Sequence, residues 1–451
     1  MKYAQQSDAR GPIAFCMFGL SLIFASTAHA SLSLTGNFDH GSLQSYSVSD
    51  NSATPTVDLV GRDNYYGGNQ WRWMNFKATG AANLTPTFVV DQPFAGGLSR
   101  LNSHPMVYSY DGLTWDFFDN SGRVFDASLG RSIFQFSNNT PFAQDNVQVA
   151  YAVPYSYGDS VAHTQATLAS PWAEPTASAL PGTAGLAGVV GQSPGGVDDV
   201  FRFVTPKDIY AYRITNPATD SATEAKRKVV LTTGMHAGET LGTHTFAGLV
   251  DWLVSDDPRA AELRDIAEFF AYPTMNPDGR FAGNSRGTVQ NPNQEPNGLW
   301  NPSLWGPHRD IAVNGQSMID DVAATPGTVD AFIDFHSTVP FPGDDFGYIE
   351  FEQFDNQADW WLRLMEIQPN VGEIDSTSVT WTSANFAEAF LMAQVDVTFE
   401  TMFGFERDLA YYTQLGENFG VAFYDAWVPE PAAALGVAWL GLTTLRRRVN
   451  P

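Results

Sequence analysis

Hydrophobic and polar residues alternate in short stretches along the first third of the chain. From residue 31 to about residue 155, apolar side chains recur at every second position, as in residues 71–77, or form brief runs such as 88–90. Clusters of Gly, Asn, Asp and Pro separate these stretches. A period of two is typical of half-buried strands, and such clusters are typical of turns. The pattern therefore predicts an all-β sandwich over residues 31–155.

Two further segments belong to this predicted sandwich. Residues 108–115 indicate a strand, an Asp-Gly turn and a second strand, because Asp-Gly favours tight hairpin turns. Residues 147–153 are the last predicted strand. No group of residues suited to catalysis occurs in this region, so its aromatic side chains are predicted to form the core.

The pattern changes after residue 155. Over residues 156–427, helical periodicity alternates with apolar runs, which predicts an α/β domain. The run 229–231 is its first clear strand, and a helix at 259–268 leads into a strand at 269–272. The Ala-, Gly- and Pro-rich stretch 171–196 is predicted to be a surface insertion or loop. Apolar residues at helical spacing follow the first strand: Phe246, Leu249, Val250, Leu253 and Val254.

Residues 1–30 are predicted to be a secretory signal peptide. A positively charged start precedes an apolar stretch at 13–24, and a small-x-small cleavage site ends at Ala30. The only cysteine, Cys16, lies inside this segment. The mature chain would therefore contain neither a disulfide nor a cysteine ligand for a metal.

Length and charge narrow the function classes. A chain of 451 residues is long enough for two or three domains. Its formal net charge of −25 argues against nucleic acid as a partner, because phosphate binding requires a basic surface. The same charge disfavours strongly acidic polymers as bulk substrates.

The first candidate chemistry lies directly after the strand 229–231. His236 and Glu239 stand three residues apart where the chain is predicted to turn from a strand into a helix. Such a pair can place an imidazole nitrogen and a carboxylate oxygen on one divalent metal. An isolated His-x-x-Glu is a weak signal in a chain with eight histidines.

Three later segments make the pair more specific. His236-x-x-Glu239 is followed in order by Asn276-Pro277-Asp278-Gly279, Asp334-Phe335-His336-Ser337 and Thr398-Phe399-Glu400. Together these segments resemble the landmarks of the zinc metallocarboxypeptidases. The resemblance implies an α/β catalytic domain in which helices flank a mixed central sheet.

The resemblance also implies a zinc site. His236, Glu239 and His336 would bind Zn2+ and leave one coordination position open for water, as catalytic zinc sites do. Ile333 and Phe335 belong to an apolar strand that would deliver His336 to the metal.

Glu400 is the expected catalytic base. It follows Val397 and Phe399, which alternate as a strand, so that the end of this strand would present the carboxylate. A carboxylate beside the metal can take a proton from water and pass it to the leaving amine. Glu388 and Glu406 are the alternative positions for this base.

A carboxypeptidase also needs arginines for the terminal carboxylate of the substrate and for the developing oxyanion. Residues 283–286 resemble the Gly-Asn-x-Arg segment of the cytosolic-carboxypeptidase branch, which implies that Arg286 polarises the scissile carbonyl. Arg280 is the alternative. Arg309 matches the arginine of the family's Asn-Arg pair, which binds the substrate carboxylate, and His308 stands in place of the asparagine.

Two stretches depart from the family pattern. Residues 287–307, between the arginines, are rich in Asn, Pro, Gly and Trp and suggest a substrate-covering loop. Residues 376–390, where better-known members place a mobile tyrosine, contain Trp381 but no tyrosine. Because of this second departure, the sequence leaves open whether the chain acts as an ordinary carboxypeptidase.

The predicted sandwich resembles the β-sandwich that precedes the catalytic domain in cytosolic carboxypeptidases and their bacterial relatives. The similar segments include residues 38–43, the Trp71 strand, and residues 108–115 and 147–157. With both domains counted, the resemblance covers nearly all of the mature chain.

The C-terminal residues 428–451 resemble a PEP-CTERM sorting tail. Val-Pro-Glu-Pro at 428–431 precedes an apolar run at 432–445 and three arginines at 446–448. The resemblance implies sorting machinery of the inner membrane as a partner. The expected location is the periplasm, the cell surface or the medium, with a transient membrane anchor. A plain amphipathic helix or a simple anchor is the alternative.

These features predict an exported zinc carboxypeptidase-like hydrolase that removes the C-terminal residue from a peptide or protein. One alternative is a zinc amidase or deacylase that acts on cell-wall stem peptides or acylated amino acids. Another is a surface binding protein with a degenerate site.

Overall fold

The computed structural model describes most of the two predicted domains. The described residues are 31–62, 69–181, 186–292, 295–306, 308–337, 344–349, 359–372, 375–376, 382–404 and 407–428. The predicted signal peptide lies outside them, as do residues 429–451 of the predicted sorting tail. None of the helices in the described ranges combines the length and the apolar character needed to cross a membrane.

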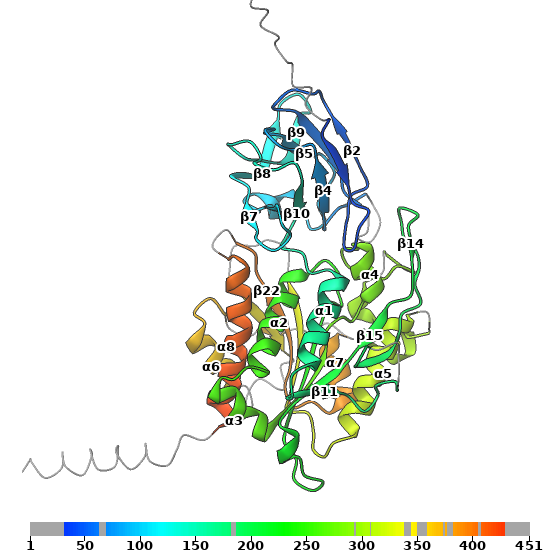
Figure 1. Cartoon of the computed structure of the whole chain (residues 1–451), viewed down its shortest axis with the longest axis vertical. Helices are drawn as coiled ribbons and strands as arrows, with labels where there is room; N and C mark the ends of the chain where they lie inside the picture. Colours follow the sequence, from blue (N-terminus) through cyan, green and yellow to red (C-terminus); the bar gives the residue numbers. More distant parts are fainter. Residues whose placement is uncertain are drawn as a thin grey trace, which may run out of the picture.

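The N-terminal region is a sandwich of two five-stranded sheets (Figure 1). The first sheet has the order β1 (Ser33–Thr35), β4 (Asn75–Thr79), β10 (Val147–Ala150), β6 (Val107–Ser109) and β7 (Asp116–Phe117). The second has the order β2 (Ser45–Val48), β3 (Thr56–Val60), β5 (Thr87–Val90), β9 (Arg131–Ser137) and β8 (Asn120–Asp126). Side chains from both sheets share one buried apolar cluster, which includes Phe76, Phe88 and Phe134. The predicted β-sandwich with an aromatic core is confirmed.

Two local predictions in the sandwich differ from the structure. The alternating stretch 71–77 becomes a paired strand only from Asn75, although Trp71 and Trp73 before it are fully buried. The predicted tight turn at Asp111-Gly112 is a wider loop between β6 and β7. The Asp111 carboxylate accepts hydrogen bonds from the backbone N–H groups of Leu113 (2.8 Å) and Thr114 (2.7 Å), which stabilises that loop.

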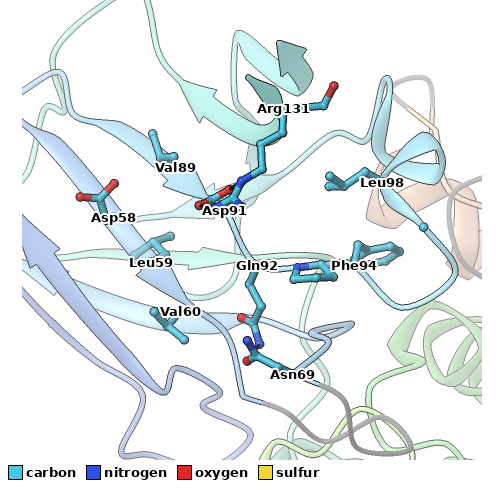
Figure 2. A pocket seen from close by; sticks show the side chains of 13 residues that line it. Asp58, Leu59, Val60, Asn69, Val89, Asp91, Gln92, Phe94, Leu98 and Arg131 are labelled. Atoms are coloured by element: carbon cyan, nitrogen blue, oxygen red, sulfur yellow. Dashed lines mark hydrogen bonds and ion pairs between the residues drawn. The ribbon is translucent and has the colours of Figure 1, made fainter. Parts of the chain in front are cut away.

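The sandwich contains a groove, and Figure 2 shows side chains that line it. A groove of about 720 Å³ lies among side chains of β3, β5 and β9. The Arg131 guanidinium pairs with the Asp91 carboxylate beside it, and Gln92 donates a hydrogen bond of 3.1 Å to Asn69 Oδ1. None of the residues of the catalytic prediction lines this groove.

The second region is built on an eight-stranded mixed sheet. Its order is β11 (Ala173–Pro175), β16 (Tyr212–Ile214), β18 (Ala267–Tyr272), β17 (Arg227–Thr233), β19 (Ala331–Ser337), β22 (Asp396–Thr401), β20 (Phe346–Ile349) and β21 (Asp375–Ser376). The four central strands β18, β17, β19 and β22 are parallel, whereas β16 and β20 run antiparallel to their central neighbours. The predicted α/β class with a mixed central sheet is confirmed.

Helices cover both faces of this sheet. One apolar cluster joins the sheet to α2 (Thr240–Leu253), α3 (Pro258–Ile266), α6 (Asp359–Ile367) and α8 (Leu409–Trp427). The opposite cluster joins it to α5 (Arg309–Ala323), α7 (Ser383–Phe386) and the 3-10 turn η3 (Pro296–Trp300). Further helical segments are α1 (Tyr157–Leu168), α4 (Pro277–Ala282), η1 (Leu98–Leu101), η2 (Pro217–Thr219), η4 (Pro302–Leu304) and the π-helical η6 (Ala387–Leu391).

The stretch 171–196 is more than the predicted surface insertion. Its β11 pairs with β16 and forms an edge of the main sheet, while β12 (Val189–Gln192) pairs with β15 (Asp208–Tyr210). A short hairpin, β13 (Gly196–Val197) with β14 (Phe203–Val204), follows. Pro175 fits an edge strand because it has no N–H to donate. A three-residue strand carries too little periodicity to be recognised in the sequence.

The sandwich packs against the α/β domain at the start of α2 (Figure 1). Leu241 and Tyr412 from the α/β domain belong to the apolar cluster of the sandwich. The Thr240 hydroxyl donates a hydrogen bond of 2.7 Å to the carbonyl of Val153. The Asp39 carboxylate accepts one of 2.8 Å from the backbone N–H of Gly158. These contacts bring the sandwich to the turn between β17 and α2.

Candidate metal centre

The turn after β17 positions the first candidate ligands. β17 is buried from Lys228 to Thr233, so the chain emerges from the sheet core at Gly234. Gly234 has φ 75°, and a Cβ there would lie 2.6 Å from Nη2 of Arg280. The positive φ would strain a residue with a side chain, and Arg280 would also have to move. The chain then turns through His236 and Glu239 into α2.

His336 and Glu400 come to the same edge of the sheet by strand register. β17, β19 and β22 are parallel neighbours, and their carboxyl ends lie at one edge. His336 is directly paired with Glu400 in the β19–β22 register. Paired residues on neighbouring strands point to the same side of a sheet, so this register explains why both side chains face the turn after β17.

His236, Glu239 and His336 form a compact donor set. Nδ1 of His236 lies 2.9 Å from Glu239 Oε1, and Nδ1 of His336 lies 2.8 Å from Glu239 Oε2. The two Nδ1 atoms are 3.1 Å apart. All three side chains are buried, and their ligand atoms lie within 4.8 Å of one another. Two imidazoles and one carboxylate are the donor types that a catalytic zinc ion takes, so the residues fit the predicted metal.

Each candidate histidine ligand also contacts a carboxylate through its remote nitrogen. His336 Nε2 lies 2.9 Å from Asp334 Oδ2, and His236 Nε2 lies 2.5 Å from Glu295 Oε1. Burial alone would lower the pKa of His336, but the carboxylates of Asp334 and Glu239 outweigh it and hold the pKa well above its ordinary value. Such partners fix the orientation of metal-binding imidazoles.

Glu295 was missed in the sequence because it lies in the stretch expected to cover the substrate. It is the N-cap of η3, and its Oε1 accepts a hydrogen bond of 3.1 Å from the backbone N–H of Asn297. Its other oxygen lies 2.8 Å from Nη2 of Arg286. The Glu-Pro pair that opens η3 is the only sequence signal, since an acidic cap before a proline favours a helical start.

Glu400 lies beside the donor set with one uncommitted oxygen. Its Oε2 is buried and has no hydrogen-bond partner within the described residues. Burial raises the pKa of Glu400, and the charge of Glu239 raises it further, while His336, His236 and Arg286 oppose this shift. A buried carboxylate with a raised pKa next to a metal site suits a group that exchanges protons.

The two candidate arginines, Arg280 in α4 and Arg286 after it, have different surroundings. Nη1 of Arg286 lies 3.4 Å from Glu239 Oε1. Arg280 is buried and donates hydrogen bonds of 2.9 Å to the carbonyl of Tyr155 and of 2.9 Å to the Thr243 hydroxyl. Arg286 therefore lies against the carboxylate of Glu239 at the candidate metal site. Arg280 instead links α4 to the segment at Tyr155 and to α2.

The Asn-Pro-Asp-Gly segment shapes the loop that carries Arg286. The Asn276 side chain caps α4 by accepting a hydrogen bond of 3.0 Å from the backbone N–H of Gly279. Its amide also donates to the carbonyls of Arg286 (3.0 Å) and Gly287 (3.1 Å). The Asp278 carboxylate accepts hydrogen bonds from Ser193 (2.5 Å) and Gly195 (2.7 Å). The side chains of Asn276 and Asp278 thus fix the backbone of neighbouring segments, including the loop that carries Arg286.

Arg309 has no side-chain hydrogen bond or ion pair with this cluster within the described residues, so its role in binding the substrate carboxylate stays a prediction. Arg309 is exposed on the first turn of α5 and forms no ion pair or hydrogen bond through its side chain in the described ranges. His308 before it is buried as the N-cap of α5, and burial lowers its pKa. The turns η3 and η4 separate both residues from Glu295 in the chain. Of the alternative bases, Glu388 is exposed in η6, and Glu406 lies outside the described residues, as does Trp381.

The buried His-Glu-His set at the carboxyl edge of the sheet has the donor types of a catalytic zinc site. Comparison with known proteins points to the same kind of site. Residues 204–337 match the family model described as zinc carboxypeptidase, a segment that contains all three candidate ligands and ends before Glu400.

Two curated relatives are both named cytosolic carboxypeptidase 2. The chain is 32% identical over 160 residues to cytosolic carboxypeptidase 2 of Xenopus tropicalis, which covers 35% of this chain and 15% of that protein. It is 26% identical over 268 residues to the human cytosolic carboxypeptidase 2, covering 55% of this chain and 27% of that one. The chain thus spans roughly a quarter or less of the length of these relatives.

A solved structure shows the same fold over both domains. The metallo-carboxypeptidase from Burkholderia cenocepacia superposes with a TM-score of 0.69 and 20% identity, covering 88% of this chain and 99% of that one. Residues 204–337 thus match a zinc carboxypeptidase domain, and their His-Glu-His set fits the zinc of that family.

Proposed function

We propose that this protein is an exported zinc carboxypeptidase that removes the C-terminal residue from a peptide or protein. The observation that carries the proposal is the buried, unbonded carboxylate oxygen of Glu400 beside His236, Glu239 and His336. Zinc at this site supplies Lewis acidity toward the scissile carbonyl and lowers the pKa of water.

The chain's own residues then perform the proton transfer and the charge stabilisation. Glu400 accepts the proton of the attacking water at its free oxygen and delivers it to the leaving amine. Its raised pKa makes Glu400 a stronger base than an ordinary carboxylate, which favours the first of these steps, the acceptance of the proton. Arg286, whose guanidinium lies 3.4 Å from Glu239 Oε1, stabilises the developing negative charge on the carbonyl oxygen.

Arg309 and His308 are the residues proposed, from the sequence, to recognise the terminal carboxylate of the substrate. The exposed side chain of Arg309 is accessible to such a carboxylate. The alternative function is a zinc amidase or deacylase that acts on cell-wall stem peptides or acylated amino acids. An Arg309→Met variant with an unchanged KM for peptides would favour this alternative.

The proposed location is outside the cytoplasm. Its support is the signal-like segment 1–30 and the tail 428–431 with the apolar run and arginines that follow. The sorting machinery of the inner membrane is the proposed partner of this tail. Cell fractionation of the full chain and of a chain truncated after residue 427 tests the role of the tail.

The hydrolytic proposal is tested with a set of peptides, with and without a chelator. We expect cleavage of the C-terminal residue that stops on chelation and returns with zinc. Glu400→Gln should lower kcat by about 10² to 10⁴-fold, since general-base catalysis contributes this much, and it should retain zinc. Cleavage that persists in chelator, or full activity in Glu400→Gln, would contradict the proposal. Cleavage of muropeptides alone would support the amidase.

A further inference from the structure

The β-sandwich reaches the metal site through a small cavity between the two domains. Arg72, Trp73 and Tyr151 of the sandwich line one side of it, and Glu239 and Ser337 of the α/β domain line the other. A candidate metal ligand thus faces a domain that lies outside the segment matched by the family model.

A glycine permits this close approach. A Cβ at Gly238, next to the ligand Glu239, would lie 3.1 Å from Cβ of Trp73 and 3.1 Å from the carbonyl oxygen of Ser285. The backbone N–H of Gly238 donates a hydrogen bond of 2.8 Å to the same carbonyl. The sandwich therefore packs directly on the backbone of the metal-binding turn.

Arg72 makes the charged contact across this junction. Its Nη2 lies 3.5 Å from Glu239 Oε1, the same oxygen that Nη1 of Arg286 approaches to 3.4 Å. The side chain of Arg72 is 12% exposed, and that of Glu239 is 8% exposed. Water therefore screens this ion pair less than a surface pair.

The backbone of Arg72 is itself firmly held. The neighbouring Trp71 and Trp73 are fully buried in the sandwich, and the ring of Trp73 stacks on His40 at 4.5 Å. On the other oxygen of Glu239, the backbone N–H of Ser337 donates a hydrogen bond of 3.3 Å. Segments of two domains thus fix both oxygens of one metal ligand.

We propose that the sandwich completes the zinc site, and that Arg72 is the positioning residue through which it orients the Glu239 carboxylate. Groups that hydrogen-bond to metal ligands fix their geometry, and their loss typically lowers metal affinity by about 10 to 100-fold. The proposal concerns zinc binding and rests on the zinc site, and peptide hydrolysis is a separate property. A protein that binds zinc tightly but cleaves no peptide would refute the proposed activity and leave this inference intact.

The test measures zinc affinity in the full chain by competition with a chromogenic chelator. We expect Arg72→Met to raise the zinc Kd by about 10 to 100-fold, and Arg72→Lys, which keeps the charge, to recover part of the loss. The visible spectrum of the Co2+-loaded protein should shift in Arg72→Met, because it reports ligand geometry. Arg123→Met removes an exposed arginine of the same sandwich and should change neither measurement.

A second control separates positioning from weakened domain packing. Asp39→Ala removes a sandwich contact to α1 without touching the cavity. The proposal is supported if Asp39→Ala lowers the Tm of the metal-free protein at least as much as Arg72→Met but leaves the zinc Kd unchanged. It is overturned if both variants lose zinc in proportion to Tm, or if Arg72→Met keeps the zinc Kd. A rise in KM alone would make Arg72 a substrate-binding residue and would overturn it too.

Discussion

The sandwich and the α/β domain differ most in the polar groups that they bury. The sandwich core is an apolar cluster rich in Trp and Phe rings, and the ring of its buried His104 has one hydrogen-bond partner among the described residues, the carbonyl of Tyr151 (2.8 Å). The α/β domain instead buries opposite charges together. Glu268 lies 2.7 Å from Arg213 Nη2 and 3.8 Å from Lys228 Nζ.

This difference shows what each domain can tolerate. A ring cluster can hold a histidine only in its neutral form, because a charge there would have no partner. The sheet of the α/β domain accommodates the charges of Lys228 and Glu268 because each has a counter-charge or several carbonyls nearby. The chemistry of the protein therefore lies in the domain whose interior already balances charge, and the sandwich contributes to it only at its border, through Arg72.

The largest expected effect is a loss of stability at low pH, caused by the buried His104 of the sandwich. Burial lowers the pKa of His104 from 6.5 to about 3. Between these values the unfolded chain binds a proton that the native state does not, so stability falls as the pH drops from about 6.5 to about 3. The full shift corresponds to a loss on the order of 5 kcal/mol, and none of it applies above pH 7.

His104→Gln removes this titration and keeps a side-chain donor for the Tyr151 carbonyl. Urea unfolding between pH 7 and pH 4 should show a shallower loss of stability in the variant than in the parent protein. His244 of the α/β domain, whose pKa burial lowers to about 4, still titrates in both proteins and provides the background slope. Equal slopes in both would show that His104 is not a proton-linked group.

The next effect tests the dependence of the α/β core on paired charge. Lys228 is fully buried, and its Nζ donates hydrogen bonds to the carbonyls of Val322 (2.8 Å) and Thr325 (3.0 Å). Lys228→Met would leave these carbonyls and Glu268 without this partner, at a cost of about 3 kcal/mol. The matched control is Arg227→Met on the same strand. Arg227 is 52% exposed in its pair with Asp330, so we expect a loss of less than about 1 kcal/mol.

Urea midpoints at pH 7 measure both variants. A loss in Arg227→Met as large as that in Lys228→Met would mean that burial does not set the value of these charges. The contrast between the two domains would then not hold.

The same contrast explains which parts of the fold could be predicted from the sequence. The central strands β17, β19 and β22 are apolar runs bounded by polar residues, so their pattern predicts them. β11 was missed because three residues at a sheet edge carry no period. The loop at Asp111 was predicted as a tight turn, because side-chain hydrogen bonds that widen a turn leave no mark in the pattern.

The site could be predicted only where its residues lie within recognisable segments. His236, Glu239 and His336 belong to such segments, and the structure brings them together. Glu295 and His236 are 59 residues apart in the sequence, and Arg72 and Glu239 are 167 residues apart. No local sequence pattern can therefore predict either contact. The role of Arg309 stays a prediction, because the turns η3 and η4 precede it and residue type cannot show where such turns lead the chain.

The smallest expected effect lies where the two regions meet. Gly238→Ala would place a Cβ 3.1 Å from Trp73 and from Ser285, so that the neighbours must move by a few tenths of an ångström. Overpacking of this kind costs about 1 to 2 kcal/mol. Gly298→Ala is the matched control, because a Cβ there meets nothing within 4 Å. In Gly238→Ala, the urea midpoint should fall and the zinc Kd should rise. In Gly298→Ala, neither quantity should change. An unchanged urea midpoint and zinc Kd in Gly238→Ala would mean that the sandwich can move away from the new Cβ at the junction. A domain that moves so easily there cannot hold the orientation of Glu239 through Arg72.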